Sequence, residues 1–235
     1  MNQPELKTTL LFGGSFDPPH LGHAEILKES ILRLVPKQAL IIPAFEAASV
    51  AKKSKLTHAT YEDRKNMCAL VVADVKESLK LDSKDTELNC EILVSDIEKD
   101  LPVPNYTINT IKKLRELAPK ESFCILIGQD QFLNFNEWKN AREILQLCDL
   151  VVVKRSGEQG ELNNILSKQL SKLGLTVKNR EGFSHELKET GKRITLIANE
   201  FSEAKSTKIR NDRKNQGQWL SPLVDSYIRE NNLYD

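Results

Sequence analysis

Two histidines three positions apart are the residues best suited to chemistry in the first part of this sequence. His20 and His23 lie in GGSFDPPHLGH, residues 13–23, directly after an apolar run. If both occupy the first turn of a helix, their side chains share one face. An imidazole donates a hydrogen bond to a phosphoryl oxygen, and a protonated one also opposes the negative charge that develops during phosphoryl transfer. The pair therefore indicates a phosphate site, to which the positive end of the helix dipole would add.

The loop around the histidines has the composition of a shaped binding loop. Gly13 and Gly14 let the backbone approach a ligand closely, and two prolines stiffen the turn before the helix. The loop matches neither the Walker A pattern nor G-x-G-x-x-G, so a different nucleotide chemistry is needed. Two alternatives stay open for the histidines. They could be metal ligands, although no third Cys, His or acidic cluster completes a site, or plain capping and packing residues.

Composition and charge narrow the class of protein. The 235 residues carry a formal net charge of +1, which gives no electrostatic support for a general nucleic-acid or membrane-surface role. No stretch approaches the roughly 20 apolar residues that cross a bilayer, and the start has no apolar secretory region, so we expect a cytoplasmic protein. The four cysteines are widely spaced without a C-x-x-C pair, which favours buried, reduced thiols over disulfides or zinc ligands.

Short apolar runs alternate with longer amphipathic stretches along most of the chain. The runs predict strands, and the amphipathic stretches predict helices. Strands that are apolar throughout and are each followed by a helix indicate an α/β protein with a Rossmann-like open parallel sheet and helices on both faces. In such a sheet, ligands bind beyond the carboxyl ends of the strands. Residues 13–23, which we call the histidine loop, lie at such an end. The predicted strands are 8–14, 39–43, 89–94, 122–128, 150–155 and 193–198, and the predicted helices are 21–35, 60–80, 107–117 and 141–147.

We expect one domain over residues 1–235, with a Rossmann-like core over 1–200 and a helical, phosphate-binding segment over 201–235. Residues 156–193 are rich in polar residues and are expected to form a surface excursion with one helical pattern, before strand 193–198 closes the sheet. Near the end, Ser221 suits an N-cap and Pro222 the first helical position. The expected core-facing stripe of this last helix is Leu223, Val224, Tyr227 and Ile228.

The histidine loop resembles the G-x-F-D-P-x-H-x-G-H signature of the nucleotidyltransferase superfamily, in which H-x-G-H holds the triphosphate of the incoming nucleotide. Three later segments resemble further motifs in the same order: NYTINTIKKL (105–114), GQDQFLNFNEW (128–138) and STKIR (206–210). Together they are similar to the nicotinate or nicotinamide mononucleotide adenylyltransferases, and the resemblance runs from Leu10 to Tyr234.

The resemblance implies a reaction in which ATP and a pyridine mononucleotide give the dinucleotide and pyrophosphate. Magnesium would be carried by the ATP phosphates, with no protein side chain as a metal ligand. His20, His23 and Arg210 would be catalytic. ATP would be bound by Gly13, Gly14, Ser15, Phe16, His20, His23, Gly128, Asp130, Ser206, Thr207 and Arg210. The mononucleotide would be bound by Ser15, Phe16, Lys53, Tyr106, Thr107, Trp138 and Arg155.

Several of these roles agree with the chemistry of the residues. Ser206 and Thr207 suit an N-cap, and the Arg210 guanidinium can grip phosphate oxygens in a fork. Trp138 would stack on the cationic pyridine ring, a contact that contributes about 0.5–2 kcal/mol. The phosphate of the mononucleotide would attack the α-phosphorus of ATP directly, so catalysis needs positioning and charge stabilisation rather than a covalent intermediate. The histidines are therefore expected to be stabilisers rather than general bases.

Two segments depart from the pattern of the similar family. The bacterial P-P-H-K segment after the second strand is absent, and the matching position falls on Lys53, with Lys52 and Lys55 close by. Ala204 and Lys205 stand where that family usually has Ile and Ser. Both departures bear on the substrate branch rather than on the proposed chemistry.

Nicotinate mononucleotide is the expected substrate, because the first motif is closest to the bacterial branch, and nicotinamide mononucleotide is a close second. The two differ in a carboxylate against a carboxamide, which hydrogen-bond donors would tell apart. A pantetheine-phosphate adenylyltransferase is disfavoured, since such chains are shorter and usually begin H-x-G-H with threonine. A catalytically inactive nucleotide-binding protein of the same fold is the alternative from another class. The sequence gives no oligomeric state.

Overall fold

The computed structural model describes residues 8–46, 58–82, 89–154, 159–198, 204–212 and 216–234. The chain divides into two compact units. One contains residues 12–105 and 202–235, and the other contains residues 8–11 and 106–201. Strand β1 (Thr8–Gly14) contributes residues to both units. The expectation of a single domain stays a prediction.

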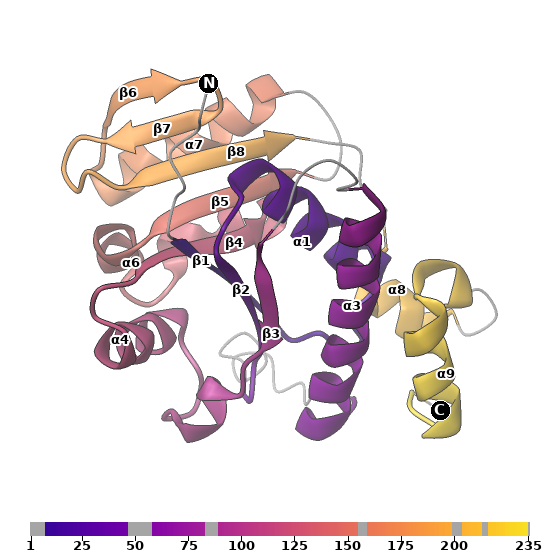
Figure 1. Ribbon diagram of the computed structural model, residues 1–235. Helices are drawn as coiled ribbons and strands as arrows, with labels where there is room; N and C mark the ends of the chain where they lie inside the picture. Colours follow the sequence, from indigo (N-terminus) through magenta and orange to yellow (C-terminus); the bar gives the residue numbers. More distant parts are fainter. Residues whose placement is uncertain are drawn as a thin grey trace. The chain divides into compact units, whose positions relative to one another are not determined.

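The first unit carries the histidine loop. It contains the end of β1, helix α1 (Leu21–Leu34), strand β2 (Gln38–Pro43), helix α3 (Tyr61–Asp82), strand β3 (Glu91–Val94) and the 3-10 helix η1 (Ile97–Asp100). Strands β2 and β3 are parallel, and α3 packs against α1, β2 and β3 (Figure 1). The later part of the chain adds α8 (Ser206–Asn211), the 3-10 helix η3 (Gln216–Trp219) and α9 (Pro222–Glu230), which packs on α3.

The second unit is built on three parallel strands, β4 (Ser122–Gly128), β5 (Asp149–Lys154) and β8 (Arg193–Ala198). Two antiparallel strands, β7 (Ser184–Leu187) and β6 (Val177–Glu181), extend this sheet beyond β8. Its helical elements are α4 (Thr107–Leu117), α5 (Gln129–Phe132), the 3-10 helix η2 (Phe135–Glu137), α6 (Ala141–Leu147) and α7 (Gln159–Leu173).

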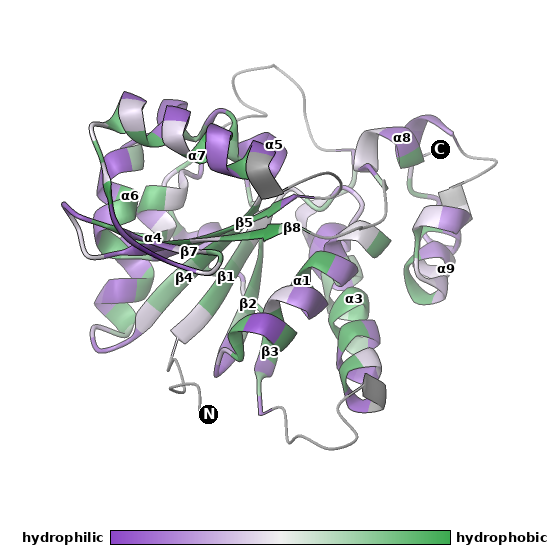
Figure 2. Cartoon of the chain, turned by 90° about the horizontal axis from the view of Figure 1, so that it is seen from above, coloured by the Kyte–Doolittle hydropathy of each residue, from purple (hydrophilic) through white to green (hydrophobic). Residues whose placement is uncertain are grey.

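Across the described residues the strands form a mostly parallel, eight-stranded sheet in the order β3-β2-β1-β4-β5-β8-β7-β6. This confirms the predicted α/β class. Leu126, Val152 and Leu196 of the middle strands are fully buried, as expected for parallel strands that are covered on both faces. Figure 2 shows β4, β5 and β8 coloured mainly as hydrophobic.

The sequence did not predict the hairpin of β6 and β7. Residues 178–181 are polar and exposed, so β6 lacks the apolar run that marks a strand. Gly182 turns between the two strands at a φ of 56°, a conformation that suits glycine. The expectation that strand 193–198 closes the sheet is therefore wrong, because β7 and β6 lie beyond it.

The predicted start of the last helix is confirmed, but one residue of its predicted apolar face is exposed. The Ser221 hydroxyl accepts a hydrogen bond from the Val224 amide, and Pro222 is the first helical residue. Val224 and Ile228 are buried, but Leu223 is 46% exposed, because it precedes Val224 by one residue and points about 100° away around the helix. Within the described residues, no helix has both the length and the apolar character that crossing a membrane requires.

The docking of α9 can be tested with two substitutions on the same helix. Ile228 is 2% exposed, so Ile228→Ala should lower the free energy of unfolding by about 2–5 kcal/mol. Leu223→Ala should lower it by less than about 0.5 kcal/mol, since the side chain is already partly in water. Urea unfolding measures both values. Equal losses from the two variants would contradict this packing.

Candidate active site

His20 and His23 form the first turn of α1, as the sequence predicted. His20 is the N-cap residue and His23 occupies the third helical position. The backbone N–H of His20 donates to Nδ1 of His23 over 3.2 Å, and the two rings stack with centroids 3.7 Å apart. Because a backbone N–H only donates, Nδ1 of His23 is the acceptor and the ring hydrogen is held on Nε2. In this contact the His23 imidazole is neutral and carries its hydrogen on Nε2.

Aromatic packing fixes the His23 ring on its other sides. The Phe16 ring meets His23 edge-on with centroids 5.0 Å apart, and the Phe12 ring lies 5.9 Å away. Phe16 is buried, and its ring lies about 3.1 Å from the place where a Cβ of Gly14 would be. Gly14 thus makes room for the Phe16 ring. The Phe16 side chain is part of this packing, while its contact with a nucleotide stays a prediction.

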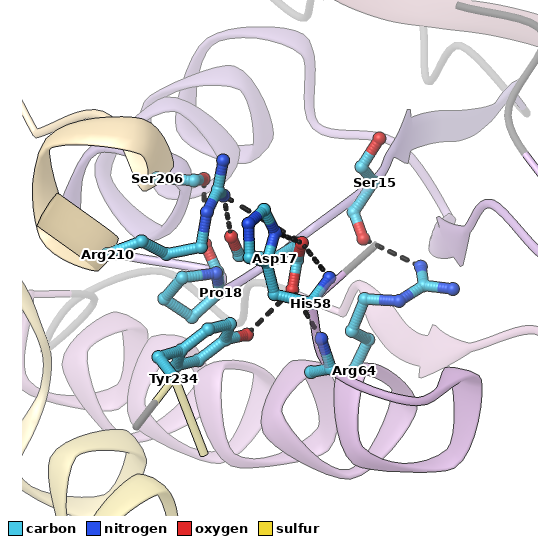
Figure 3. A network of polar contacts seen from close by, with 9 residues as sticks. Ser15, Asp17, Pro18, His58, Arg64, Ser206, Arg210 and Tyr234 are labelled. Atoms are coloured by element: carbon cyan, nitrogen blue, oxygen red, sulfur yellow. Dashed lines mark hydrogen bonds and ion pairs between the residues drawn. The ribbon is translucent and has the colours of Figure 1, made fainter. Parts of the chain in front are cut away.

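Asp17 is the centre of a polar network that ties four segments together (Figure 3). Asp17 is buried, with 5% of the residue exposed. Oδ2 accepts from the His58 amide at 2.8 Å and lies 3.3 Å from His58 Nδ1, and Oδ1 accepts from the Ala59 amide at 3.1 Å and the Tyr234 hydroxyl at 2.9 Å. Oδ2 also lies 3.8 Å from Nη1 of Arg210. Burial alone would raise the pKa of this carboxyl, but these hydrogen bonds and the Arg210 charge together hold it below its ordinary value.

Helix α8 approaches the same loop through two side chains. The Ser206 hydroxyl donates to the Pro18 carbonyl oxygen at 2.9 Å, and Nη1 of Arg210 donates to the Asp17 carbonyl oxygen. The structure therefore brings Arg210 to the residues that precede His20. Thr207 is exposed.

The expected capping role of Ser206 and Thr207 is wrong. Lys205 is the N-cap residue of α8, and Ser206 already has a helical position. Because Ser206 is already the first helical residue, its hydroxyl is not placed to cap α8, and it donates to the Pro18 carbonyl oxygen. Ala204, the first of the two departures from the family pattern, is fully buried.

Arg64 supports the loop from the side of α3. It is fully buried, and its Nη1 donates to the carbonyl oxygens of Ser15 and Ala44 at 2.8 Å each. Burial lowers the pKa of Arg64, and the Asp17 charge opposes that shift. Through Arg64, the backbone at Ser15 and the end of β2 are held by one cation. Asp17, Arg64 and Tyr234 are not among the residues that the sequence predicts for the site, although Asp17 stands inside the G-x-F-D-P-x-H-x-G-H signature.

The second unit holds the other described candidates. Gly128 ends β4, and a Cβ there would lie 2.5 Å from Oδ1 of Asp130, which is exposed. Trp138 is half-buried against Phe135, with ring centroids 5.2 Å apart.

Two further candidates of this unit lie at the start of α4. Tyr106 precedes α4, its ring is covered by Nζ of Lys139 at 4.4 Å from the centroid, and Thr107 is the first residue of the helix. Lys53 and Arg155, two further predicted residues, lie outside the described residues.

Helix α7 braces the segment between Asp130 and Trp138. Gln169 is 3% exposed, its Nε2 donates to the Leu133 carbonyl oxygen at 2.6 Å, and its Oε1 accepts from the Asn136 amide at 3.1 Å. At the start of α7, Glu161 accepts from Gln129 at 3.4 Å and pairs with the buried Lys154 at the end of β5. Residues 156–193 were expected to be a surface excursion, but their helix holds the loop that carries two candidate residues.

Cys68, Cys124 and Cys148 are buried free thiols, and Cys90 is partly buried. Burial raises the pKa of Cys148 to about 12, so the thiol stays protonated. Among the residues that the structure describes, no group of three or more His, Cys, Asp or Glu could hold a metal ion.

The contacts of Gln169 on α7 can be tested with two variants that should differ in stability. Gln169→Leu leaves the Leu133 carbonyl and the Asn136 amide without this partner, so it should lower the free energy of unfolding by about 2 kcal/mol and speed hydrogen exchange of the Asn136 amide. Lys172→Ala should change stability by less than about 0.5 kcal/mol, because Lys172 makes a 3.4 Å contact with Asn136 at the surface. Urea unfolding and exchange measured by NMR separate the two. An unchanged Asn136 exchange rate in Gln169→Leu would show that the brace is not needed.

Comparison with known proteins supports the family that the motifs indicate. A sequence profile for cytidylyltransferase-like proteins matches residues 11–212. The probable nicotinate-nucleotide adenylyltransferase of Leptospira borgpetersenii serovar Hardjo-bovis is 35% identical over 164 residues, which cover 68% of this chain and 74% of the relative. That of Aquifex aeolicus is 31% identical over 191 residues, covering 81% of this chain and 99% of the relative.

The fold is also found among solved structures. The Plasmodium falciparum nicotinic acid mononucleotide adenylyltransferase complexed with NaAD aligns with a TM-score of 0.68 at 18% identity, over 97% of this chain and 98% of that chain. This likeness concerns the fold alone. The two sequence matches carry the assignment: the chain belongs to the cytidylyltransferase-like family and, within it, to the nicotinate-nucleotide adenylyltransferases.

Proposed function

We propose that this protein transfers the adenylyl group of ATP to nicotinate mononucleotide, which gives nicotinate adenine dinucleotide and pyrophosphate. The observation that carries the proposal is the turn at His20 and His23, where His23 keeps an N–H donor on Nε2 while Arg210 of α8 is anchored to the same loop. The relatives from Leptospira and Aquifex are named for this activity.

The chemistry needs little more than alignment and positive charge. The phosphate of the mononucleotide attacks the α-phosphorus of ATP, the new P–O bond forms, and the bond to the bridging oxygen of pyrophosphate breaks. Negative charge then grows on the non-bridging oxygens and on the leaving group. We assign the Nε2–H of His23 and the Arg210 guanidinium to these oxygens, where fixed donors stabilise the transition state. His23 is a stabiliser rather than a base, because the lone pair of Nδ1 already accepts from the His20 amide.

Magnesium is expected to be carried by ATP rather than by the protein. Asp17 is the carboxylate next to the histidine turn, and both of its oxygens accept hydrogen bonds from the His58, Ala59 and Tyr234 donors. A carboxylate that is used in this way and faces Arg210 is poorly suited to bind a cation. When bound to the polyphosphate, the ion would neutralise part of its charge.

The remaining substrate contacts are carried over from the motifs. Asp130 would hold the ribose hydroxyls of the adenosine, and its exposed carboxylate is available for such contacts. Trp138 would stack on the pyridine ring with the face that Phe135 does not cover, and Tyr106 and Thr107 would line the mononucleotide pocket. Lys53 and Arg155 are proposed to bind the phosphate of the mononucleotide.

The central experiment offers the purified protein ATP, magnesium and either nicotinate or nicotinamide mononucleotide, and measures pyrophosphate release. We expect the larger kcat/KM with nicotinate mononucleotide. Equal values for the two substrates would contradict the assigned preference, and ATP binding without turnover on either would support the inactive nucleotide-binding alternative. His23→Ala is the internal control, because loss of one transition-state donor should lower kcat by about 100-fold or more.

A second prediction uses Gly128 to test the role of Asp130. Gly128→Ala would push the Asp130 carboxylate aside, since its Cβ would lie 2.5 Å from Oδ1, and this exposed side chain can move without straining the fold. Gly128→Ala and Asp130→Ala should each raise the KM for ATP by about tenfold. The double variant should show no further increase, because both changes remove the same contact.

Gly217→Ala is the matched control for the glycine substitution. A Cβ at Gly217 would make ordinary contacts at 3.7 Å with Asp225, so the KM for ATP should stay within about twofold of wild type. If Asp130→Ala raises the KM and Gly128→Ala does not, the geometric link between the two residues is wrong.

A further inference from the structure

Tyr234 reaches the centre of the site from the segment that follows α9. After this helix the chain turns back on itself: Asn232 has a φ of 51° and Tyr234 a φ of 65°, and the Leu233 amide donates to the Ile228 carbonyl oxygen at 3.0 Å. This turn is the left-handed type that ends many helices. It directs the Tyr234 ring toward Asp17, where the hydroxyl donates to Oδ1 at 2.9 Å (Figure 3).

The helix before Tyr234 is held in place by other contacts. Val224 and Ile228 are buried, and the Tyr227 hydroxyl donates to Oδ1 of Asp63 at 3.0 Å and lies 3.1 Å from Nδ2 of Asn66, both on α3. The bond from Tyr234 to Asp17 is therefore separate from the docking of α9. Two tyrosines in one short segment each donate to an aspartate, and one of these aspartates belongs to the histidine loop.

The Tyr234 hydroxyl competes with Arg210 for the charge of Asp17. Oδ1 receives the Tyr234 hydroxyl and the Ala59 amide, and Oδ2 faces Arg210 at 3.8 Å. A carboxylate that accepts several hydrogen bonds from neutral donors attracts a nearby guanidinium less strongly. Burial raises the pKa of Tyr234, with the Asp17 charge adding to the effect, so the phenol keeps its hydrogen and remains a donor throughout the working pH range.

We propose that Tyr234 is a positioning residue for adenylyl transfer: by donating to Asp17, it keeps the Arg210 guanidinium placed for the ATP phosphates instead of collapsed onto the aspartate. The inference rests on the proposed function of Arg210. Without the hydroxyl, Oδ1 loses its donor from this segment, the carboxylate makes a stronger ion pair with Arg210, and the guanidinium moves toward Asp17.

The test compares Tyr234→Phe with Tyr227→Phe, which removes the same group from the same segment but from Asp63 instead of Asp17. Tyr234→Phe should lower kcat by about tenfold and leave the KM for the mononucleotide within about twofold. Tyr227→Phe should leave both constants within about twofold of wild type. Urea unfolding of both variants shows that the difference in kcat does not arise from lost stability.

The pH profile adds a readout that a purely structural role would not change. Within the part of the chain that the structure describes, the ionisable groups that interact with Asp17 include His58, Tyr234, Arg210 and Arg64. The hydrogen bonds and the charge hold the pKa of Asp17 below its ordinary value, so the ionised form is present above that pKa and is lost as the pH falls through it. Tyr234→Phe removes one donor from the carboxylate and brings the Arg210 charge closer to it, so the acid limb of kcat should move in Tyr234→Phe and stay in place in Tyr227→Phe.

The outcomes separate this inference from the proposed function. A Tyr234→Phe variant with wild-type kcat and an unmoved acid limb would overturn the role of Tyr234 while leaving adenylyl transfer in place. Equal losses of kcat in both phenylalanine variants would also overturn it, because the effect would then belong to the docking of α9. A wild-type protein that releases no pyrophosphate with either mononucleotide would contradict the proposed function itself.

Discussion

The first unit is constrained by the need to stabilise the buried carboxylate of Asp17. A carboxylate at this depth is stable as an ion only if polar groups replace the water that it loses. Asp17 accepts hydrogen bonds from the amides of His58 and Ala59 and from the Tyr234 hydroxyl, and it faces the charge of Arg210. These groups come from three segments of the chain: the residues before α3, helix α8 and the residues after α9. Each segment must reach the loop for the charge to be satisfied, so the same requirement that stabilises the ion also assembles the site.

The histidine turn depends on this arrangement through the backbone. Asp17 and Pro18 precede the turn by two or three residues, and their carbonyl oxygens accept from Arg210 and Ser206. Arg64 holds the carbonyl of Ser15 from the opposite side of the loop. With the backbone held at three points, the first turn of α1 has a defined direction, and the cap between His20 and His23 then sets which ring nitrogen carries the hydrogen. A donor that is fixed before the substrate arrives costs little reorganisation in the reaction.

Much of the fold and the histidine turn were predictable from sequence because their signals are local. Strands β1, β2, β4 and β5 contain apolar runs, and α4, β4 and α6 begin and end at the predicted residues. The hairpin of β6 and β7 gave no signal, because polar, exposed strands look like loops. Leu223 looked like part of an apolar stripe, but it is 46% exposed, while Val224 and Ile228 of the same helix are buried.

The network around Asp17 could not be predicted from sequence, because its members are far apart in the chain. Ala59 lies 42 positions and Tyr234 lies 217 positions from Asp17, and no periodicity connects them. The same holds for Gln169, which braces a loop 36 positions away. Ser206 was expected to be a cap by its type and place, but it is the first helical residue of α8, and its hydroxyl donates to a tertiary partner, the Pro18 carbonyl.

The most direct test of this account is the ionisation of Asp17 itself. Carboxyl-carbon NMR of the folded protein, titrated from neutral to acid pH, follows this side chain and can be read beside the amide signals of His58 and Ala59. If Asp17 is a buried, hydrogen-bonded carboxylate ion, the midpoint lies below the ordinary aspartate value of 3.8, and both amide signals shift over the same pH range. A midpoint at or above that value, or amide signals that do not respond, would contradict the claim that a buried carboxylate ion holds the loop together.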